Sequence, residues 1–217
     1  MASGTGRRTS ARERVEAARE AERRRRRRRI IVGILLVAVV VTGGALAGIA
    51  GGGGHRETAR PSWPRPEDTA DRARAIGLSV APMEGTARHF HAHLDILVAG
   101  RPVAVPAGLG IATGGDAMAE LHTHDTTGVV HIEAPTTGKR YVLGQLFAEW
   151  NLRLDATDLG GLRAGGGQAL TAYVDGRRQS GDPAKIELTP HREIALVYGP
   201  AEARPKVPAS YTFGPGL

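Results

Sequence analysis

The chain has 217 residues, no cysteine and a formal net charge of +7. The lack of cysteine excludes disulfide-stabilised scaffolds, iron–sulfur clusters and blue-copper centres, since each of these needs the cysteine sulfur. The charge does not indicate nucleic-acid binding, because residues 1–29 hold twelve arginines and four glutamates, whereas the remaining 17 basic and 18 acidic residues carry −1.

The first 50 residues have the pattern of a membrane anchor. Residues 30–50 are uncharged and follow seven consecutive arginines, and they are long enough to cross ~30 Å of hydrocarbon as a helix. Because positive charge stays on the cytoplasmic side, we predict an arginine-rich cytoplasmic tail at 1–29 and a transmembrane signal anchor at 30–50. The remainder of this single-pass protein is then extracytoplasmic, and anionic lipid head groups are the expected partners of the arginines. A cleaved signal peptide is the alternative, since Ala45-Leu46-Ala47 resembles a cleavage site.

After the span, glycines and prolines predict a linker over residues 51–79 that includes a short helix at 67–76. A β-rich α+β domain is expected over residues 80–200, and an extended, proline-containing tail over 201–217. Alternation of apolar and polar residues predicts strands at 87–98, 102–106, 119–124, 129–134, 168–175, 184–188 and 192–198. One helix at 144–151 should place Leu143, Leu146, Phe147 and Trp150 on the sheet, because their spacing follows the helical period.

Six of the eight histidines form three short groups in this domain. Side chains alternate between the faces of a strand, so His89, His91 and His93 should project to one side, with Asp95 next in line. Phe90, Ala92, Leu94 and Ile96 form the apolar row of the opposite side. The strand should therefore bury one face and present its histidines on the other.

The second and third groups lie on a predicted hairpin. With residues 125–128 as its loop, His122 lies directly opposite His131, and position 124 faces 129 while 120 faces 133. Directly opposed residues have Cβ atoms ~5 Å apart, close enough for two imidazoles to share a metal ion, with His124 as a third ligand. Glu133 follows His131 on the same face. The alternative is a histidine-rich polar face that binds no metal.

Imidazole ligands without thiolate favour zinc or copper over nickel, iron or manganese. We therefore predict a metal site formed by some or all of the following residues: His89, His91, His93, His122, His124 and His131. His55 and His191 stand apart from these groups. Six imidazoles exceed the ligands of one ordinary zinc ion, so the cluster is compatible with one ion or two.

Three segments together resemble a family of exported, often membrane-anchored bacterial and archaeal proteins without an established activity. They are HFHAHLDILVAGRPVAVPAGLGI, LHTHDTTGVVHIE and YVLGQLFAEW, and the resemblance covers roughly residues 70–200. It supports the domain boundaries and the histidine groups but implies no reaction.

Two partial resemblances concern shorter stretches. Gly85 with His91-Ala92-His93, and Gly100 with Pro106-Ala107-Gly108, are similar to the two cupin motifs, although the expected glutamate is missing and Ile111 replaces a histidine. Leu121-His122-Thr123-His124 looks like the copper-ligand segment of peptidylglycine and dopamine monooxygenases, whose disulfide-rich remainder has no counterpart here.

Three functional hypotheses follow. The first is metal capture, buffering or sensing outside the cytoplasm. The second is a metal-dependent hydrolase or copper oxygenase, with Glu133 as general base ahead of Asp95 or Glu120. The third is a metal-free interaction module whose histidines titrate or stay exposed.

Overall fold

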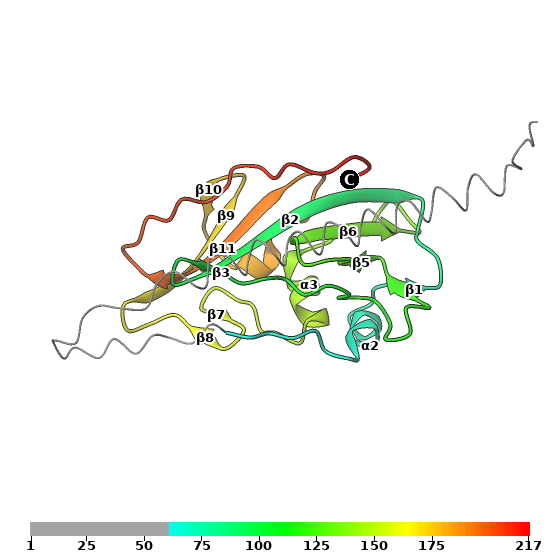
Figure 1. Cartoon of the computed structure of the whole chain (residues 1–217), viewed down its shortest axis with the longest axis horizontal. Helices are drawn as coiled ribbons and strands as arrows, with labels where there is room; N and C mark the ends of the chain where they lie inside the picture. The colour runs from blue at the N-terminus through cyan, green and yellow to red at the C-terminus, as the bar shows by residue number, and fades with distance from the viewer. Residues whose placement is uncertain (1–60) are drawn as a thin grey trace, which may run out of the picture. The chain divides into compact units, whose positions relative to one another are not determined.

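The computed structural model describes residues 61–217, so the predicted cytoplasmic tail and membrane span lie outside the described residues. Within the described part, no helix has both the length and the apolar character needed to cross a bilayer. This part is β-rich and carries two short α-helices, as the sequence predicts for its class (Figure 1).

The centre of the domain is a seven-stranded sheet with the order β10-β9-β11-β2-β6-β5, and β3 pairs with β2 off this path. Its strands are β2 (Arg88–Val98), β3 (Arg101–Pro102), β5 (Leu121–His122), β6 (Val129–Ala134), β9 (Gln168–Val174), β10 (Arg177–Gln179) and β11 (Glu193–Pro200). The pair β11–β2 is parallel, with Glu193 opposite His93, whereas the other neighbouring pairs are antiparallel. The first long strand of the domain and its last therefore lie side by side in the middle of the sheet.

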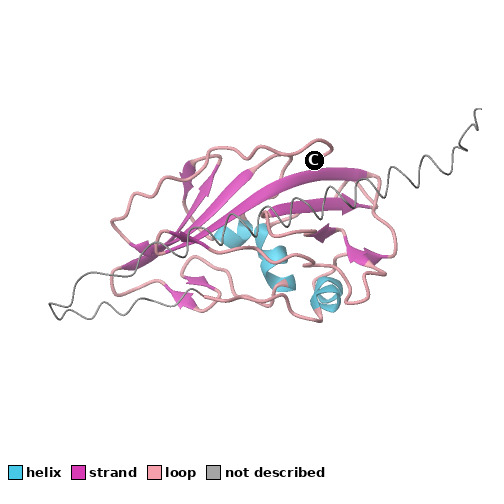
Figure 2. Cartoon of the chain, viewed as in Figure 1, coloured by secondary structure: helices cyan, strands magenta, loops and turns pink. Residues whose placement is uncertain are grey.

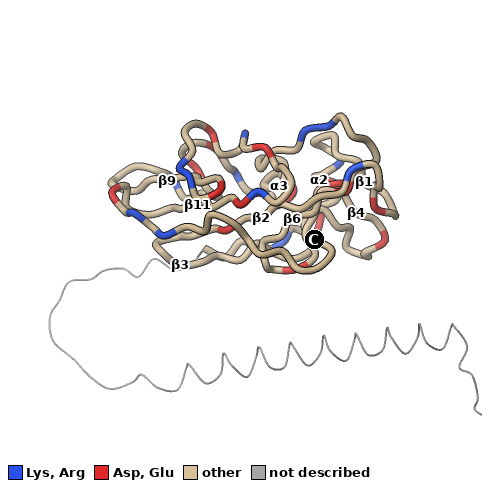
Figure 3. The backbone as a smooth tube through the Cα atoms, turned by 90° about the horizontal axis from the view of Figure 1, so that it is seen from above, with Lys and Arg blue, Asp and Glu red and all other residues tan. Residues whose placement is uncertain are grey.

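Smaller elements surround this sheet. Two-stranded sheets are formed by β1 (Val80–Ala81) with β4 (Met118–Ala119), and by β7 (Asp158–Leu159) with β8 (Leu162–Arg163). The helices are α2 (Thr69–Ala75), α3 (Leu143–Glu149) and the 3-10 helix η1 (Pro183–Lys185). The helices lie on one side of the sheet, as Figure 2 shows. Lysine and arginine are interspersed with aspartate and glutamate along the described chain (Figure 3).

Three predicted strands differ from the structure, and the one expected at 119–124 is divided between β4 and β5, which belong to different sheets. The strand expected at 102–106 ends at Pro102, although the Val103 amide still donates to the Ile96 carbonyl at 2.8 Å. The strand expected at 184–188 is replaced by η1, because Pro183 occupies the first turn and the Asp182 side chain accepts from the Ala184 amide. The predicted strand at 129–134 is confirmed with its bounds unchanged.

The apolar face of β2 forms the core, as predicted. Phe90, Ala92, Leu94 and Ile96 are all buried, and all belong to one hydrophobic cluster. Helix α3 contributes the four residues expected from its periodicity, and each is no more than 1% exposed: Leu143, Leu146, Phe147 and Trp150. Burial of such side chains stabilises a fold by about 1.5–3 kcal/mol each.

Part of the stretch predicted as linker belongs to the folded domain. The Trp63 ring packs edge-on against Trp150 at 6.0 Å between centroids, and Trp150 Nε1 donates to the Trp63 carbonyl at 2.9 Å. Thr69 at the start of α2 donates to the Glu149 carbonyl at 3.0 Å. The short helix expected in this region is therefore present and is anchored to α3.

One buried carboxyl group in the core lacks a partner. Glu149 is fully buried, and neither of its side-chain oxygens makes a hydrogen bond within the described chain. Burial raises its pKa well above the ordinary value, and the neighbouring Glu120 raises it further. Burial at the end of α3 therefore favours the neutral form of this carboxyl group, since an unpaired buried charge is costly.

Candidate metal centre

Three adjacent strands bring the histidine groups into one row. In β2, β6 and β5, His91 lies opposite His131 and His131 lies opposite His122. Neighbouring strands are ~4.8 Å apart, and directly opposed side chains point to the same face. The next pair along the same face is His89 with Glu133. The predicted pairing of His122 with His131 is thus confirmed, and β2 extends the row beyond the hairpin.

The hairpin is shorter than predicted. Strand β5 ends at His122, so position 124 does not pair with 129. The reason lies in Thr123, whose amide donates to the Leu109 carbonyl at 3.1 Å and whose carbonyl accepts from the Gly108 amide at 2.8 Å. Residue 123 therefore pairs with the 108–109 segment instead of β6. His124 follows on the segment that leaves β6, but its ring still contacts His122 and His131.

The ring nitrogens of the histidines face one another in pairs. His122 Nε2 lies 3.1 Å from His124 Nε2, and His89 Nε2 lies 3.2 Å from His91 Nε2. Two ligand nitrogens on a tetrahedral zinc ion are ~3.3 Å apart, given bonds of ~2.0–2.1 Å. Both pairs therefore have close to the spacing of two imidazoles that share an ion.

A backbone contact sets the tautomer of His122. Its Nδ1 lies 2.8 Å from the Ala119 carbonyl oxygen, which only accepts hydrogen bonds. Nδ1 therefore carries the proton, and the lone pair of Nε2 faces His124. Such a second contact to backbone is the usual way in which a metal-ligating imidazole is oriented.

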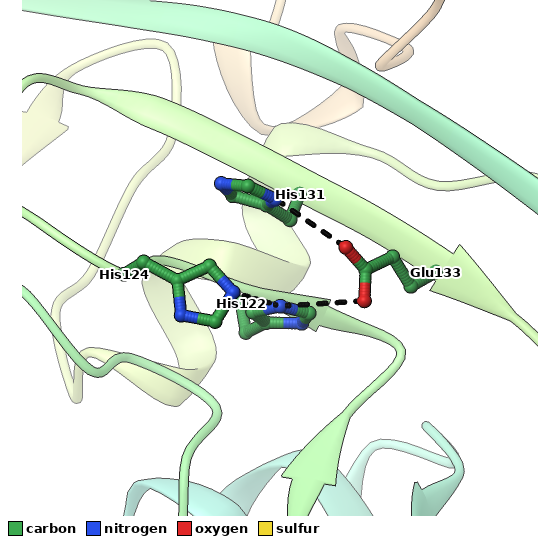
Figure 4. Close-up of side chains that lie close together, drawn as sticks. All are labelled: His122, His124, His131 and Glu133. Carbon is green, nitrogen blue, oxygen red and sulfur yellow. Dashed lines mark hydrogen bonds and ion pairs between the residues drawn. The ribbon is translucent and has the colours of Figure 1, made fainter. Parts of the chain in front are cut away.

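Glu133 places its carboxylate between the histidine groups. Its Oε1 lies 3.4 Å from His131 Nδ1, and its Oε2 lies 3.8 Å from His122 Nε2 (Figure 4). The same Oε1 also lies 3.4 Å from His89 Nε2. Glu133 Oε2 and His131 Nδ1 are buried, and neither makes a hydrogen bond within the described residues. Buried polar atoms without partners are costly, so these atoms are suited to bind a cation.

The electrostatics keep the buried imidazoles neutral. Burial lowers the pKa of His122 to about 4 and, with the neighbouring imidazoles, that of His131 to about 3. Burial, followed by His89, lowers the pKa of His91, and burial raises the pKa of Glu133. Metal ligation requires neutral imidazole, so His122 and His131 are already in the ligating state at neutral pH.

His93 is the one predicted ligand that the fold places apart from this row. Its Nδ1 lies 2.7 Å from Glu193 Oε2, and its Nε2 lies 2.8 Å from the Thr127 carbonyl. Burial lowers its pKa, but the hydrogen bond and charge of Glu193 outweigh this effect, so the pKa is raised. Both ring nitrogens of His93 make hydrogen bonds, which link β2 to β11 and to the 125–128 loop. His93, Asp95 and Glu193 also have ligand atoms close enough together to hold a metal ion, separate from the row.

The C-terminal tail covers this part of the histidine face. Tyr211 stacks on His93 at 3.8 Å between ring centroids, and Phe213 stacks on His191 at 4.9 Å. The tail was expected to be extended, and no pattern in its sequence predicts these contacts. Figure 1 shows it running along the sheet on the side opposite the helices.

Removing the aromatic ring of Tyr211 tests the tail contact. We expect Tyr211→Ala to lower the free energy of unfolding by about 1–2 kcal/mol, because a stacked ring pair and its buried area are lost. Leu217→Ala, a change at an exposed position of the same tail, should have a negligible effect. Urea denaturation followed by circular dichroism measures both, and equal stabilities of the two variants would contradict the contact.

Glu120, one of the alternative general bases, has structural partners. Glu120 accepts from the Ser79 amide at 3.0 Å and from the Tyr141 hydroxyl at 2.8 Å, and it pairs with Lys139. Because these partners occupy its carboxylate, Glu120 is poorly suited to act as a general base. His55 lies outside the described residues. The sequence analysis did not identify Ala119, which orients His122 through its backbone carbonyl, because any residue type can supply a backbone carbonyl.

Comparisons of the chain with protein-family models, with curated proteins and with solved structures gave no match. The site is therefore interpreted from its own geometry. Two groups of the described residues have ligand atoms close enough to hold a metal ion on the histidine row: His122, His124, His131 and Glu133; and His89, His91 and Glu133.

Proposed function

We propose that this protein is a single-pass membrane protein whose extracytoplasmic domain binds copper or zinc for capture, buffering or sensing. The observation that carries the proposal is the convergence of five histidines and Glu133, with facing nitrogens 3.1 and 3.2 Å apart. Two imidazole nitrogens whose lone pairs point at each other repel, unless a proton or a cation lies between them. Imidazole with carboxylate is a donor set that suits zinc and copper.

Access to the cluster favours uptake from solution. His124 and His89 are exposed, whereas His91, His122, His131 and Glu133 are buried beneath them. An ion can therefore reach the outer ligands first and then the buried ones. The arginine-rich tail and the uncharged segment 30–50 support a location at the outer face of the cell membrane.

Two surface hollows of the described domain lie away from the histidine row. Two hollows of about 420 and 570 Å³ are lined by residues of β9 and β10 and by the 180–192 region, and no cluster histidine lines either. Enzyme substrates usually bind in such hollows next to the reacting groups. Neither of these two hollows supports a substrate site at the histidine row, and the enzyme hypothesis is kept as the second candidate.

Metal binding should appear as stabilisation of the full-length chain, purified in detergent without a histidine tag. Zinc at a hundredfold excess over Kd should raise the free energy of unfolding by ~2.7 kcal/mol, which corresponds to a Tm increase of about 5–10 °C. His124→Gln should reduce this shift, whereas His191→Asn, at a histidine outside the row, should retain it. Differential scanning calorimetry with zinc and with copper measures the shift.

An unchanged Tm with either metal would leave the metal-free interaction module as the better account. If metal binds, Glu133→Gln separates a binding protein from an enzyme with a Glu133 base. Metal retained with loss of a hydrolytic or oxidative activity found in the wild type would favour the enzyme. Weakened metal binding would instead identify Glu133 as a ligand.

A further inference from the structure

The row contains more ligands than one ion takes. Five imidazoles and one carboxylate converge there, whereas zinc sites in proteins are almost always four-coordinate. Hydrogen bonds between neighbouring rings account for part of this set, but His131 Nδ1 and Glu133 Oε2 make no hydrogen bond within the described residues. The donor set must therefore be divided between ions or be partly unused.

The positions of the nitrogens divide the set into two halves. One facing pair belongs to β2, namely His89 and His91, and the other belongs to β5 and the chain after it, namely His122 and His124. Each pair has close to the nitrogen spacing of two ligands on a single ion. His131 on β6 lies between the halves, with ring centroids 4.5 Å from His91 and 4.6 Å from His124.

Glu133 is the residue that belongs to both halves. Its Oε1 is 3.4 Å from both His89 Nε2 and His131 Nδ1, and its Oε2 is 3.8 Å from His122 Nε2. A carboxylate that lies close to the ligands of both halves is placed to bridge two ions. Two-metal sites in proteins hold their ions ~3.5–4 Å apart, which is within the span of one carboxylate.

We propose that the histidine row is a dinuclear metal centre bridged by the Glu133 carboxylate. One ion is held by His122, His124 and His131, and the other by His89 and His91. This inference rests on the proposed metal-binding function and specifies its stoichiometry and the division of its ligands. Both ions are divalent zinc or copper, and the positions left open on the β2 half face the exposed His89 side, where water or an oxyanion completes the coordination.

The test uses the exposed ligand of each half, because replacing an exposed residue leaves the core intact. The full-length chain, purified in detergent without a histidine tag, is dialysed against buffered free zinc, and bound zinc is measured by mass spectrometry. Wild type and the control His191→Asn should bind about two ions, and His89→Gln and His124→Gln about one each. A thermal melt of each metal-free variant establishes that it is folded.

Copper supplies a second readout. Two Cu²⁺ ions joined by a carboxylate couple magnetically, so the fully loaded wild type should give a weakened or broadened electron paramagnetic resonance signal. His89→Gln should restore the signal of an isolated Cu²⁺ ion, and so should His124→Gln. Glu133→Gln, which keeps the side-chain shape, should remove the coupling.

The outcomes separate this inference from the proposed function. One ion in wild type that is lost in His124→Gln but kept in His89→Gln would overturn the dinuclear centre and leave a mononuclear site. One ion lost in both variants would overturn it as well, because all the ligands would then serve one ion. No metal in wild type would overturn the dinuclear centre and the proposed function together.

Discussion

Gly110→Ala is expected to lower the free energy of unfolding by about 2–5 kcal/mol. Gly110 has φ of +72°, and a Cβ atom there would lie 2.3 Å from the Leu121 carbonyl oxygen and 3.1 Å from the His122 Cβ. Left-handed backbone costs an alanine ~1–2 kcal/mol, and crowding against packed backbone adds ~1–3 kcal/mol. Urea denaturation followed by circular dichroism measures the loss.

Gly115 provides a matched control. Its φ of +69° is nearly the same, but nothing lies within 4 Å of the position of a Cβ atom. Gly115→Ala should therefore show the backbone cost alone, ~1–2 kcal/mol. Because the clash at Gly110 lies directly behind His122, Gly110→Ala should also weaken zinc binding, whereas Gly115→Ala should not. Equal stabilities of the two variants would show that the 108–111 segment does not press against β5.

Glu149→Gln is expected to remove a pH-dependent loss of stability. Burial raises the pKa of Glu149 well above 4.5 in the folded state, so its stabilising contribution is complete below pH 4.5 and is lost as the pH rises toward the folded pKa. Over that window the wild type should lose about 1.4 kcal/mol per pH unit from this group. Glutamine stays neutral, so the variant should become the more stable protein as the pH rises.

The measurement compares urea denaturation of the metal-free wild type and Glu149→Gln from pH 5 to pH 8. Glu202→Gln changes an exposed carboxylate and controls for the loss of one charge. The difference between wild type and Glu149→Gln should grow with pH, while Glu202→Gln should follow the wild type. A constant difference across the range would mean that Glu149 is ionised in the folded protein.

The local features of the site were predictable because they depend on period and turn length. Alternation along residues 88–98 separates the histidines from Phe90, Ala92, Leu94 and Ile96, and the predicted hairpin places His122 opposite His131. The helical period of Leu143, Leu146, Phe147 and Trp150 identifies the buried face of α3. In each case the residues that define the pattern lie close together in the chain.

The features that were missed depend on distant partners. The residues next to His93 in the sequence do not indicate that its ring nitrogens form hydrogen bonds with Glu193 and with the Thr127 carbonyl. The spacing of the histidines alone therefore could not show that His93 lies apart from the others. Likewise, the early end of β5 is decided by the 108–109 backbone, which pairs with Thr123. Strands β7, β8 and β10 are two or three residues long, too short for alternation to be recognised.

The parallel pair β2–β11 has a consequence for how the domain forms. Glu193 is opposite His93, from which it is separated by 100 residues, and contacts between such distant positions slow folding because a long loop must close first. While the domain folds, β2, β6 and β5 can associate early, but β2 keeps an unpaired edge until β11 pairs with it. An open edge invites pairing with other chains. The domain is therefore most exposed to aggregation before β11 has paired with β2.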